Sequence, residues 1–440
     1  MMIKVQAMTT AVSGTPVRPG KTYEMSVLDH LMAAHHLRIV FYYRSEDMRK
    51  LRDSLTEALS YYPPVTGRLE RRKEDGNWEV KCNDAGVRVL EAKLDVSLDE
   101  WLRSARAEEE IDLTYWEEMP ENPYIWSPFY VQMNEFEGGG LAIGLTCTHM
   151  QADPTCATLL VKAWSDMHRQ SSIVHPPFFH PPGLRGRINP NTDTKSSKYY
   201  AAKSKARPPP HAKMSTATLK FSDAAVKKCL SDVHTRCSDA TPFDVLSALL
   251  WSRVVAAKAS MNMDGEAQTA LSICIDFRKL MHAALPHGYY GNALHFSSVS
   301  STMAEMEEGG VGFVAEIIHH HLSGLDEEEY WSAIDWVESQ KDMEGKFAPP
   351  FRMYGPELTC ANMEHLPAYD VMFDKDVKPV HVAYHVGNVE GEGLILVLPS
   401  PEEGLGRTVS VTLPVEQLEK VLSDNAILRL EPTVLFSGKW

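Results

Sequence analysis

The sequence predicts an α/β protein made of two mixed-sheet domains of similar size, with a solvent channel between them. The chain has 440 residues, more than one ordinary hydrophobic core supports. Strand-like and helix-like patterns are interspersed in both halves, and a proline-rich stretch near the middle is typical of a connection between domains. We therefore divide the chain into an N-terminal half at 1–190, a crossover at 191–214 and a C-terminal half at 215–440.

The composition narrows the classes of function. Hydrophobic residues make up 44% and charged residues 23% of the chain, which excludes wholesale disorder. The net charge of −15 disfavours nucleic acids and anionic membrane surfaces as partners. The seven cysteines are scattered without a CxxC pair, which favours reduced thiols. With no signal peptide or transmembrane segment evident, we expect a cytoplasmic protein.

The elements of the first half follow from short patterns. Apolar residues at helical spacing predict a helix over 48–62 that stops at Pro63. Alternation and turn residues predict strands that begin near 68, 78 and 87.

A strand–turn–helix unit is the clearest feature of this half. Residues 141–149 (LAIGLTCTH) alternate as a strand does, after a triple-glycine turn. Asp153 followed by Pro154 is typical of a helix N-cap with proline at the first helical position. The apolar spacing then continues as a helix to about Met167.

In the second half, helices and strands are again interspersed. The helices are predicted at 223–234, 241–258 (amphipathic, capped by Thr241) and 415–422, and the strands at 217–221, 271–275, 379–386, 393–398 and 408–413.

His149 and Asp153 form an HxxxD string that could carry chemistry. A chain with 18 histidines contains about one such spacing by chance, so the string alone is weak evidence. At the end of a strand, however, a neutral imidazole that faces a crevice can take a proton from an attacking hydroxyl or amine. The strand–turn–helix unit and the crossover place that crevice between the halves. The same residues also fit a core histidine followed by a capping aspartate.

The run His319–His321 does not predict a metal site. Three consecutive residues on a helix fan out over about 200° and cannot all meet one ion, so a mostly solvated face is expected. We expect no metal in this protein.

From end to end the chain resembles the plant BAHD acyltransferase family. The matching segments, in family order, are LRDSLTEALSYYPPVTGRL, CNDAGVRVLEA, GGGLAIGLTCTHMQADPTC, TPFDVLSALLWSRVVAAK, the DxR triplet Asp276–Arg278 and the YxGN turn Tyr289–Asn292.

The resemblance implies a role for each site residue. In the family, an acyl-CoA thioester and an acceptor enter opposite sides of a channel. By resemblance, His149 is the general base, while Asp153 points away from substrate and holds the loop, with Arg278 as its partner. Acyl-CoA is then a donor or ligand, with no tightly bound cofactor.

The second family signature, DFGWG, is not retained. The chain reads YDVMFDKDV over 369–377, and one placement sets Met372 on the aspartate and Lys375 on the tryptophan, with one extra residue. In the family this loop is structural and shapes the channel. We therefore expect Asp374 and Asp376, in place of small glycines, to alter or partly close the channel.

The chain retains HxxxD but has lost DFGWG. In this combination it resembles the eceriferum/glossy branch of cuticular-wax proteins. That likeness implies that the protein promotes very-long-chain fatty acid elongation together with a ketoacyl-CoA synthase-type condensing enzyme. This partner would hold the protein at the endoplasmic reticulum. By itself the protein is expected to be a monomer. The alternatives are an active CoA-dependent O- or N-acyltransferase that uses His149, and a non-catalytic protein with an unrelated partner.

Overall fold

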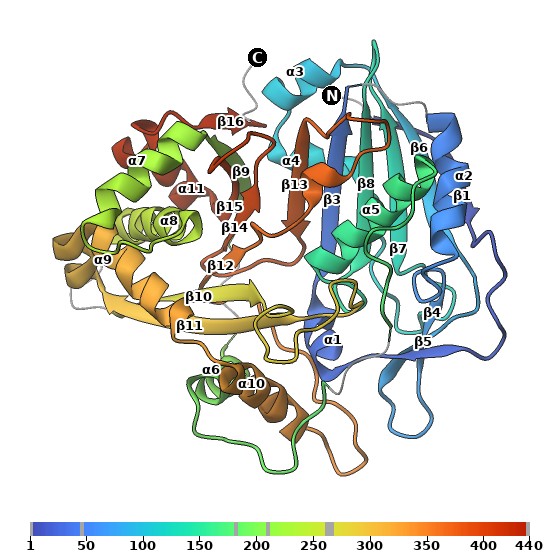
Figure 1. The fold of residues 1–440 in the computed structure, drawn as a ribbon, viewed down its shortest axis with the longest axis horizontal. Helices are drawn as coiled ribbons and strands as arrows, with labels where there is room; N and C mark the ends of the chain where they lie inside the picture. The colour runs from blue at the N-terminus through green and yellow to red at the C-terminus, as the bar shows by residue number, and fades with distance from the viewer. Residues whose placement is uncertain (1–2, 45–47, 180–183, 208–211, 260–267, 437–440) are drawn as a thin grey trace.

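The structure is a computed structural model that describes residues 3–44, 48–179, 184–207, 212–259 and 268–436. Two large mixed sheets lie side by side, the first on the right and the second on the left of Figure 1. Helices flank both sheets, and one hydrophobic cluster runs through the two halves. The predicted class of two mixed-sheet α/β halves is confirmed.

The first sheet has six strands, and its central strands are buried on both faces. Within β3, Ile39 and Phe41 belong to the main core, whereas Val40 and Tyr42 face a second cluster around Trp101. This alternation follows from the two-residue repeat of a strand. The strand order is β1 (Ile3–Ala11), β6 (Val87–Leu94), β7 (Phe129–Glu135), β8 (Leu141–Thr148), β3 (His36–Tyr43) and β13 (His381–Val386); only β6 and β7 pair in parallel.

Strand β13 crosses from the C-terminal half into this first sheet. It pairs antiparallel with β3, with His381 opposite Tyr42 and Val386 opposite Leu37. A cut of the sequence near residue 215 therefore does not separate the two sheets, because the edge of the first is supplied by residues 381–386.

The second sheet has seven strands, and its middle is parallel. Strands β10, β12 and β14 run in the same direction, so their carboxyl ends meet at one edge. The order is β11 (Leu294–Thr302), β10 (Gln268–Asp276), β12 (Leu358–Asn362), β14 (Leu394–Pro399), β15 (Arg407–Pro414), β9 (Met214–Phe221) and β16 (Thr433–Leu435), and a small third sheet contains β2 (Thr22–Glu24), β5 (Trp78–Lys81) and β4 (Arg68–Arg71).

Two helices cover the first sheet. Helix α2 (Met48–Leu59) buries Leu51, Leu55 and Leu59, as its apolar spacing predicts, and packs on α5 (Pro154–His168). The shorter helices of this half are α1 (Val27–Leu31), α3 (Leu98–Ser104) and α4 (Ala107–Glu110).

Helix α8 (Pro242–Ala259) is buried nearly all round, so its predicted amphipathic character is wrong. It lies among α7, α9 and α11, which leaves little of its surface to solvent. The helices of the second half are α7 (Asp223–His234), α9 (Met303–Ser323), α10 (Glu327–Ser339), α11 (Val415–Leu422) and α12 (Asn425–Leu428). Among the helices described, none is both long and apolar enough to cross a bilayer.

The crossover is not wholly extended. Helix α6 (Lys195–Lys203) begins at the N-cap Thr194 and packs on α10, below the sheets in Figure 1. The Lys203 ammonium pairs with Glu357, so this lysine of the crossover is buried in an ion pair. Residues 208–211 of this stretch lie outside the described part.

Candidate active site

His149 stands on the turn that joins β8 to α5. Every residue of β8 is buried, and its last residue, Thr148, is opposite His36 of β3. The His149 amide donates to the His35 carbonyl at 3.0 Å, and Asp153 then caps the helix. The predicted strand–turn–helix unit is therefore present, and it brings His149 into contact with Asn292 and Tyr354 of the second half.

The His149 side chain is enclosed. It is 0% exposed, and its Nε2 lies 3.2 Å from the Tyr354 hydroxyl, while Nδ1 has no hydrogen-bond partner. Burial lowers the pKa of His149 to about 4, although the nearby carbonyls of His149 itself and Ala152 and the Asp153 carboxylate oppose this. The imidazole is therefore neutral at pH 7, the form that a general base requires.

Asp153 holds the turn with both carboxylate oxygens. Oδ1 accepts from the Cys156 amide at 2.9 Å as the helix N-cap, and Oδ2 accepts from the Ala293 amide at 3.0 Å. Oδ2 also lies 2.8 Å from a terminal nitrogen of Arg278. The ion pair expected from the sequence is present, and these contacts bind Asp153 to the second half.

Arg278 is the centre of a buried charge network. Its guanidinium pairs with Asp276 at 2.6 Å as well as with Asp153, and it donates to the Gly291 carbonyl at 2.8 Å. Burial alone would raise the pKa of Asp276, but Arg278 and then His365 hold that pKa below its ordinary value. One cation shared by two carboxylates locks the HxxxD turn onto β10.

Two further residues position His149, and the sequence reasoning missed their role. Asn292 Nδ2 donates to the His149 carbonyl at 2.9 Å and to Asp29 Oδ1 at 2.8 Å. Asp29 also forms a capping box with Ser26 at the start of α1. The Ser-x-x-Asp spacing at 26–29 was the only local signal for Asp29.

Two cavities lie near the site, and His149 lines neither of them. One of about 640 Å³, a volume ordinary for a small-molecule site, lies at the carboxyl ends of β10 and β12. Thr155 lines it and donates to Asp276 at 2.7 Å, and Lys279 supplies a cation for an anionic ligand group. The other, of about 260 Å³, lies between the sheets and is lined by His36 and Gly387.

The predicted channel is interrupted at His149. His35 lies between His149 and the cavity between the sheets. The His35 Nδ1 lies 3.1 Å from the Gly387 carbonyl, and the His35 ring packs edge-on against Tyr354. Large aromatic and imidazole rings from both halves fill the place where solvent was expected.

The degenerate loop lies far from His149, so it does not shape the surroundings of the candidate base; that Asp374 and Asp376 alter the channel elsewhere stays a prediction. Phe373 packs against Trp164 and His168 at the carboxyl end of α5. Because α5 has 15 residues, that end is roughly 22 Å from the HxxxD turn. Asp376 has φ 63°, a left-handed conformation that glycine adopts more readily.

Within the described residues, no group of three or more His, Cys, Asp and Glu side chains could hold a metal ion. The histidine run on α9 is less solvated than predicted. His319 Nδ1 lies 2.9 Å from Asp244, and His321 Nε2 lies 2.8 Å from the Ser297 hydroxyl. Only His320 of the three is exposed.

A histidine on an HxxxD turn, anchored by a buried aspartate–arginine pair between two mixed-sheet halves, defines the class of CoA-dependent acyltransferase folds. A family model described as "Transferase family" matches residues 1–427, and the chain belongs to this family, the BAHD acyltransferases.

Its relatives cover nearly the whole chain. Shikimate O-hydroxycinnamoyltransferase of Nicotiana tabacum is 25% identical over 96% of this chain and 100% of its own length. Protein ECERIFERUM 26-like of Arabidopsis thaliana is 27% identical over 94% of this chain and 93% of its own.

Solved structures share the fold. Vinorine synthase has a TM-score of 0.74 at 18% identity and covers 98% of both chains. F. sporotrichioides TRI101, complexed with coenzyme A and T-2, has a TM-score of 0.73 at 16% identity over 95% of this chain and 100% of its own.

Proposed function

We propose that this protein binds acyl-CoA and promotes very-long-chain fatty acid elongation for cuticular wax, together with a ketoacyl-CoA synthase-type condensing enzyme. In this role His149 does not turn over acyl groups. The observation that carries the proposal is the enclosure of the candidate general base. His149 is fully buried, and its Nε2 faces the Tyr354 hydroxyl. The resemblance to the eceriferum branch, with one such relative at 27% identity, supports the choice of process.

A second candidate is acyl transfer to an alcohol or amine with His149 as general base. The intact anchor favours it, because Asp153 and Arg278 remain paired at 2.8 Å beneath the turn. In this reaction Nε2 takes the acceptor's proton as the acceptor attacks the thioester carbonyl. The C–S bond then breaks and the proton passes to the CoA thiolate. Relatives named as hydroxycinnamoyltransferases agree with this chemistry.

Substitution of His149 separates the two candidates. The full chain is co-expressed with a condensing enzyme in a host whose fatty acids are then measured by mass spectrometry. If the elongation role is correct, His149→Ala retains most of the effect of the wild type on chain length. If His149 is an essential base, the same variant loses about 10²–10⁴-fold in rate and the longest products disappear.

Two controls make this result interpretable. His282→Ala removes an exposed histidine and leaves the products unchanged in either case. Asp153→Ala breaks the buried anchor and reports the loss of effect that misfolding causes. Loss of the longest products in His149→Ala, with a melting temperature equal to that of the wild type, refutes the elongation role without catalysis.

A further inference from the structure

Tyr354 lies at the inner end of a long irregular segment. Residues 340–357 connect α10 to β12 and contain neither helix nor strand. Exposure changes sharply along this segment, since Met343 is fully exposed whereas Tyr354 is 0% exposed. One segment therefore links the solvent to the candidate base.

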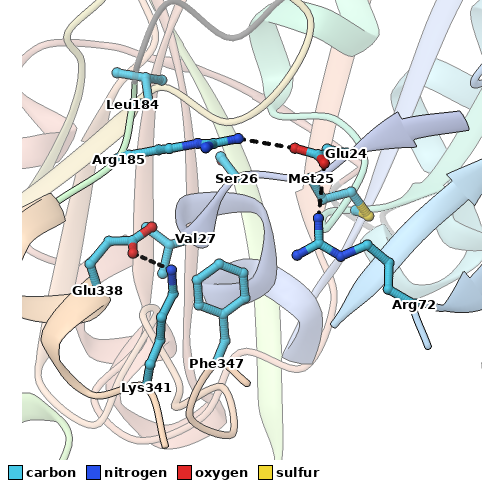
Figure 2. Close-up of a pocket in the computed structure, with 10 residues that line it drawn as sticks. All are labelled: Glu24, Met25, Ser26, Val27, Arg72, Leu184, Arg185, Glu338, Lys341 and Phe347. Atoms are coloured by element: carbon cyan, nitrogen blue, oxygen red, sulfur yellow. Dashed lines mark hydrogen bonds and ion pairs between the residues drawn. The ribbon is translucent and has the colours of Figure 1, made fainter. Parts of the chain in front are cut away.

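The outer part of the segment borders a solvent-accessible pocket of about 540 Å³ (Figure 2). Lys341 and Phe347 line this pocket together with Val27 of α1. The segment is attached to the small sheet through Asn77, which donates to the Gly345 carbonyl at 3.0 Å and accepts from the Phe347 amide at 2.8 Å. Solvent thus reaches the segment as far as Arg352, whereas Met353, Tyr354 and Gly355 are buried.

The inner end fills the site. The Tyr354 ring packs edge-on against His35 at 5.1 Å and Phe296 at 5.4 Å between ring centroids. Burial raises the pKa of Tyr354 well above its usual value and lowers that of His149 to about 4, so both groups are neutral at pH 7. In the tautomer that leaves Nε2 unprotonated, the Tyr354 hydroxyl donates to this nitrogen across 3.2 Å.

That contact has the geometry an attacking hydroxyl needs, since a general base must lie about 2.6–3.2 Å from the group it deprotonates. We propose that Tyr354 is a built-in occupant of the acceptor position at His149, and that it silences a latent acyl-CoA hydrolysing and transferring site. The inference rests on the closed base of the proposed function but not on the elongation role.

Removal of Tyr354 then admits water to the base. Water attacks the thioester carbonyl while His149 Nε2 takes its proton. The C–S bond breaks, and the proton passes to the CoA thiolate. The products are a free fatty acid and CoA with a free thiol, and no oxidant or further reactant is consumed.

The test uses the purified full-length chain, palmitoyl-CoA and mass spectrometric detection of free CoA. We expect Tyr354→Ala to release CoA at least about tenfold faster than the wild type, and Tyr354→Ala/His149→Ala to lose that gain. Tyr354→Leu keeps apolar packing but is too short to reach Nε2, so it tests the same point if the alanine variant does not fold.

Accessibility is measured independently by labelling with diethyl pyrocarbonate and mapping the modified peptides. His282, which is exposed, provides the internal reference. In the wild type and in Tyr354→Phe, which keeps the ring, His149 should label far more slowly than His282. In Tyr354→Ala the rate at His149 should approach that of His282.

Tyr42→Ala is the matched control, because Tyr42 is also 0% exposed but belongs to the second core cluster. Equal CoA release from Tyr42→Ala would indicate general loosening and overturn the proposal. The proposal would also be overturned if His149 of the wild type were labelled as fast as His282. A third refuting outcome is a folded Tyr354→Ala variant in which His149 is labelled but no His149-dependent CoA release occurs. A failed elongation assay leaves these outcomes unaffected.

Discussion

Replacement of Asp153 by alanine should destabilise the fold far more than loss of a helix cap does. Asp153 is 0% and Arg278 2% exposed, and removing one partner of a buried ion pair costs about 3–5 kcal/mol. The substitution also removes the cap on the Cys156 amide, for which about 0.5–2 kcal/mol is typical. Because Arg278 keeps Asp276 as a partner, we expect a total of about 4 kcal/mol rather than the sum.

The expected change in melting temperature follows from the size of the chain. Unfolding entropy of roughly 2.1 cal/mol/K per residue gives about 0.9 kcal/mol/K for 440 residues that unfold as one unit. The fall for Asp153→Ala is then about 4 °C, measured by calorimetry or circular dichroism. The melting temperature of Asp153→Asn should fall nearly as far, because the amide keeps one hydrogen-bond acceptor but offers Arg278 no negative charge.

Asp326→Ala provides the matched control. Asp326 caps α10 by accepting from the Glu329 amide, and it is exposed. Its loss should cost about 1 kcal/mol, or about 1 °C. A melting temperature for Asp153→Ala no lower than that for Asp326→Ala would refute the anchoring role of Asp153, especially if ligand binding changed instead.

Two further predictions concern stability. Burial lowers the pKa values of His30 and His149 to about 4, so the unfolded chain binds more protons than the folded chain below pH 6.5. The free energy of unfolding should therefore be highest above pH 6.5 and fall by about 2 kcal/mol for each group between pH 6.5 and 5. Urea titrations measure this change, and a constant or rising free energy of unfolding would contradict the assignment. Gly387→Ala should lower the free energy of unfolding by about 1–3 kcal/mol, because the added methyl group would clash with the His36 ring. Gly312→Ala in α9 meets nothing closer than 3.7 Å and should raise the free energy of unfolding by about 0.5–1 kcal/mol. Chemical denaturation of both variants measures this difference.

Local elements could be predicted closely from the sequence. The strand predicted to begin near 78 starts at Trp78, and the helices predicted at 223–234 and 415–422 have those bounds in the structure. The Asp153 cap and the following proline likewise marked the start of α5. These signals depend on residues within one or two turns of each other, which the order of the chain alone specifies.

Long-range pairing could not be predicted in this way. Strand β13 joins β3 across more than 300 residues, and the pattern of neither strand names the other. The resemblance supplied Arg278 as the partner of Asp153, but no pattern connected Asp29 to Asn292, which lie 263 positions apart. The remoteness of the degenerate loop from His149 likewise required the packing of Phe373 on α5.

The sequence by itself determined the local elements and, through the resemblance, the family and the residues of the HxxxD anchor. Only the tertiary structure decided whether the base is open. Tyr354 is 205 positions from His149, on a segment without periodicity. Its hydroxyl meets Nε2 because His35, which precedes β3, and Phe296 of β11 confine its ring. Closure of a site depends on which side chains fill the same volume, and that is settled by packing rather than by the order of residues along the chain.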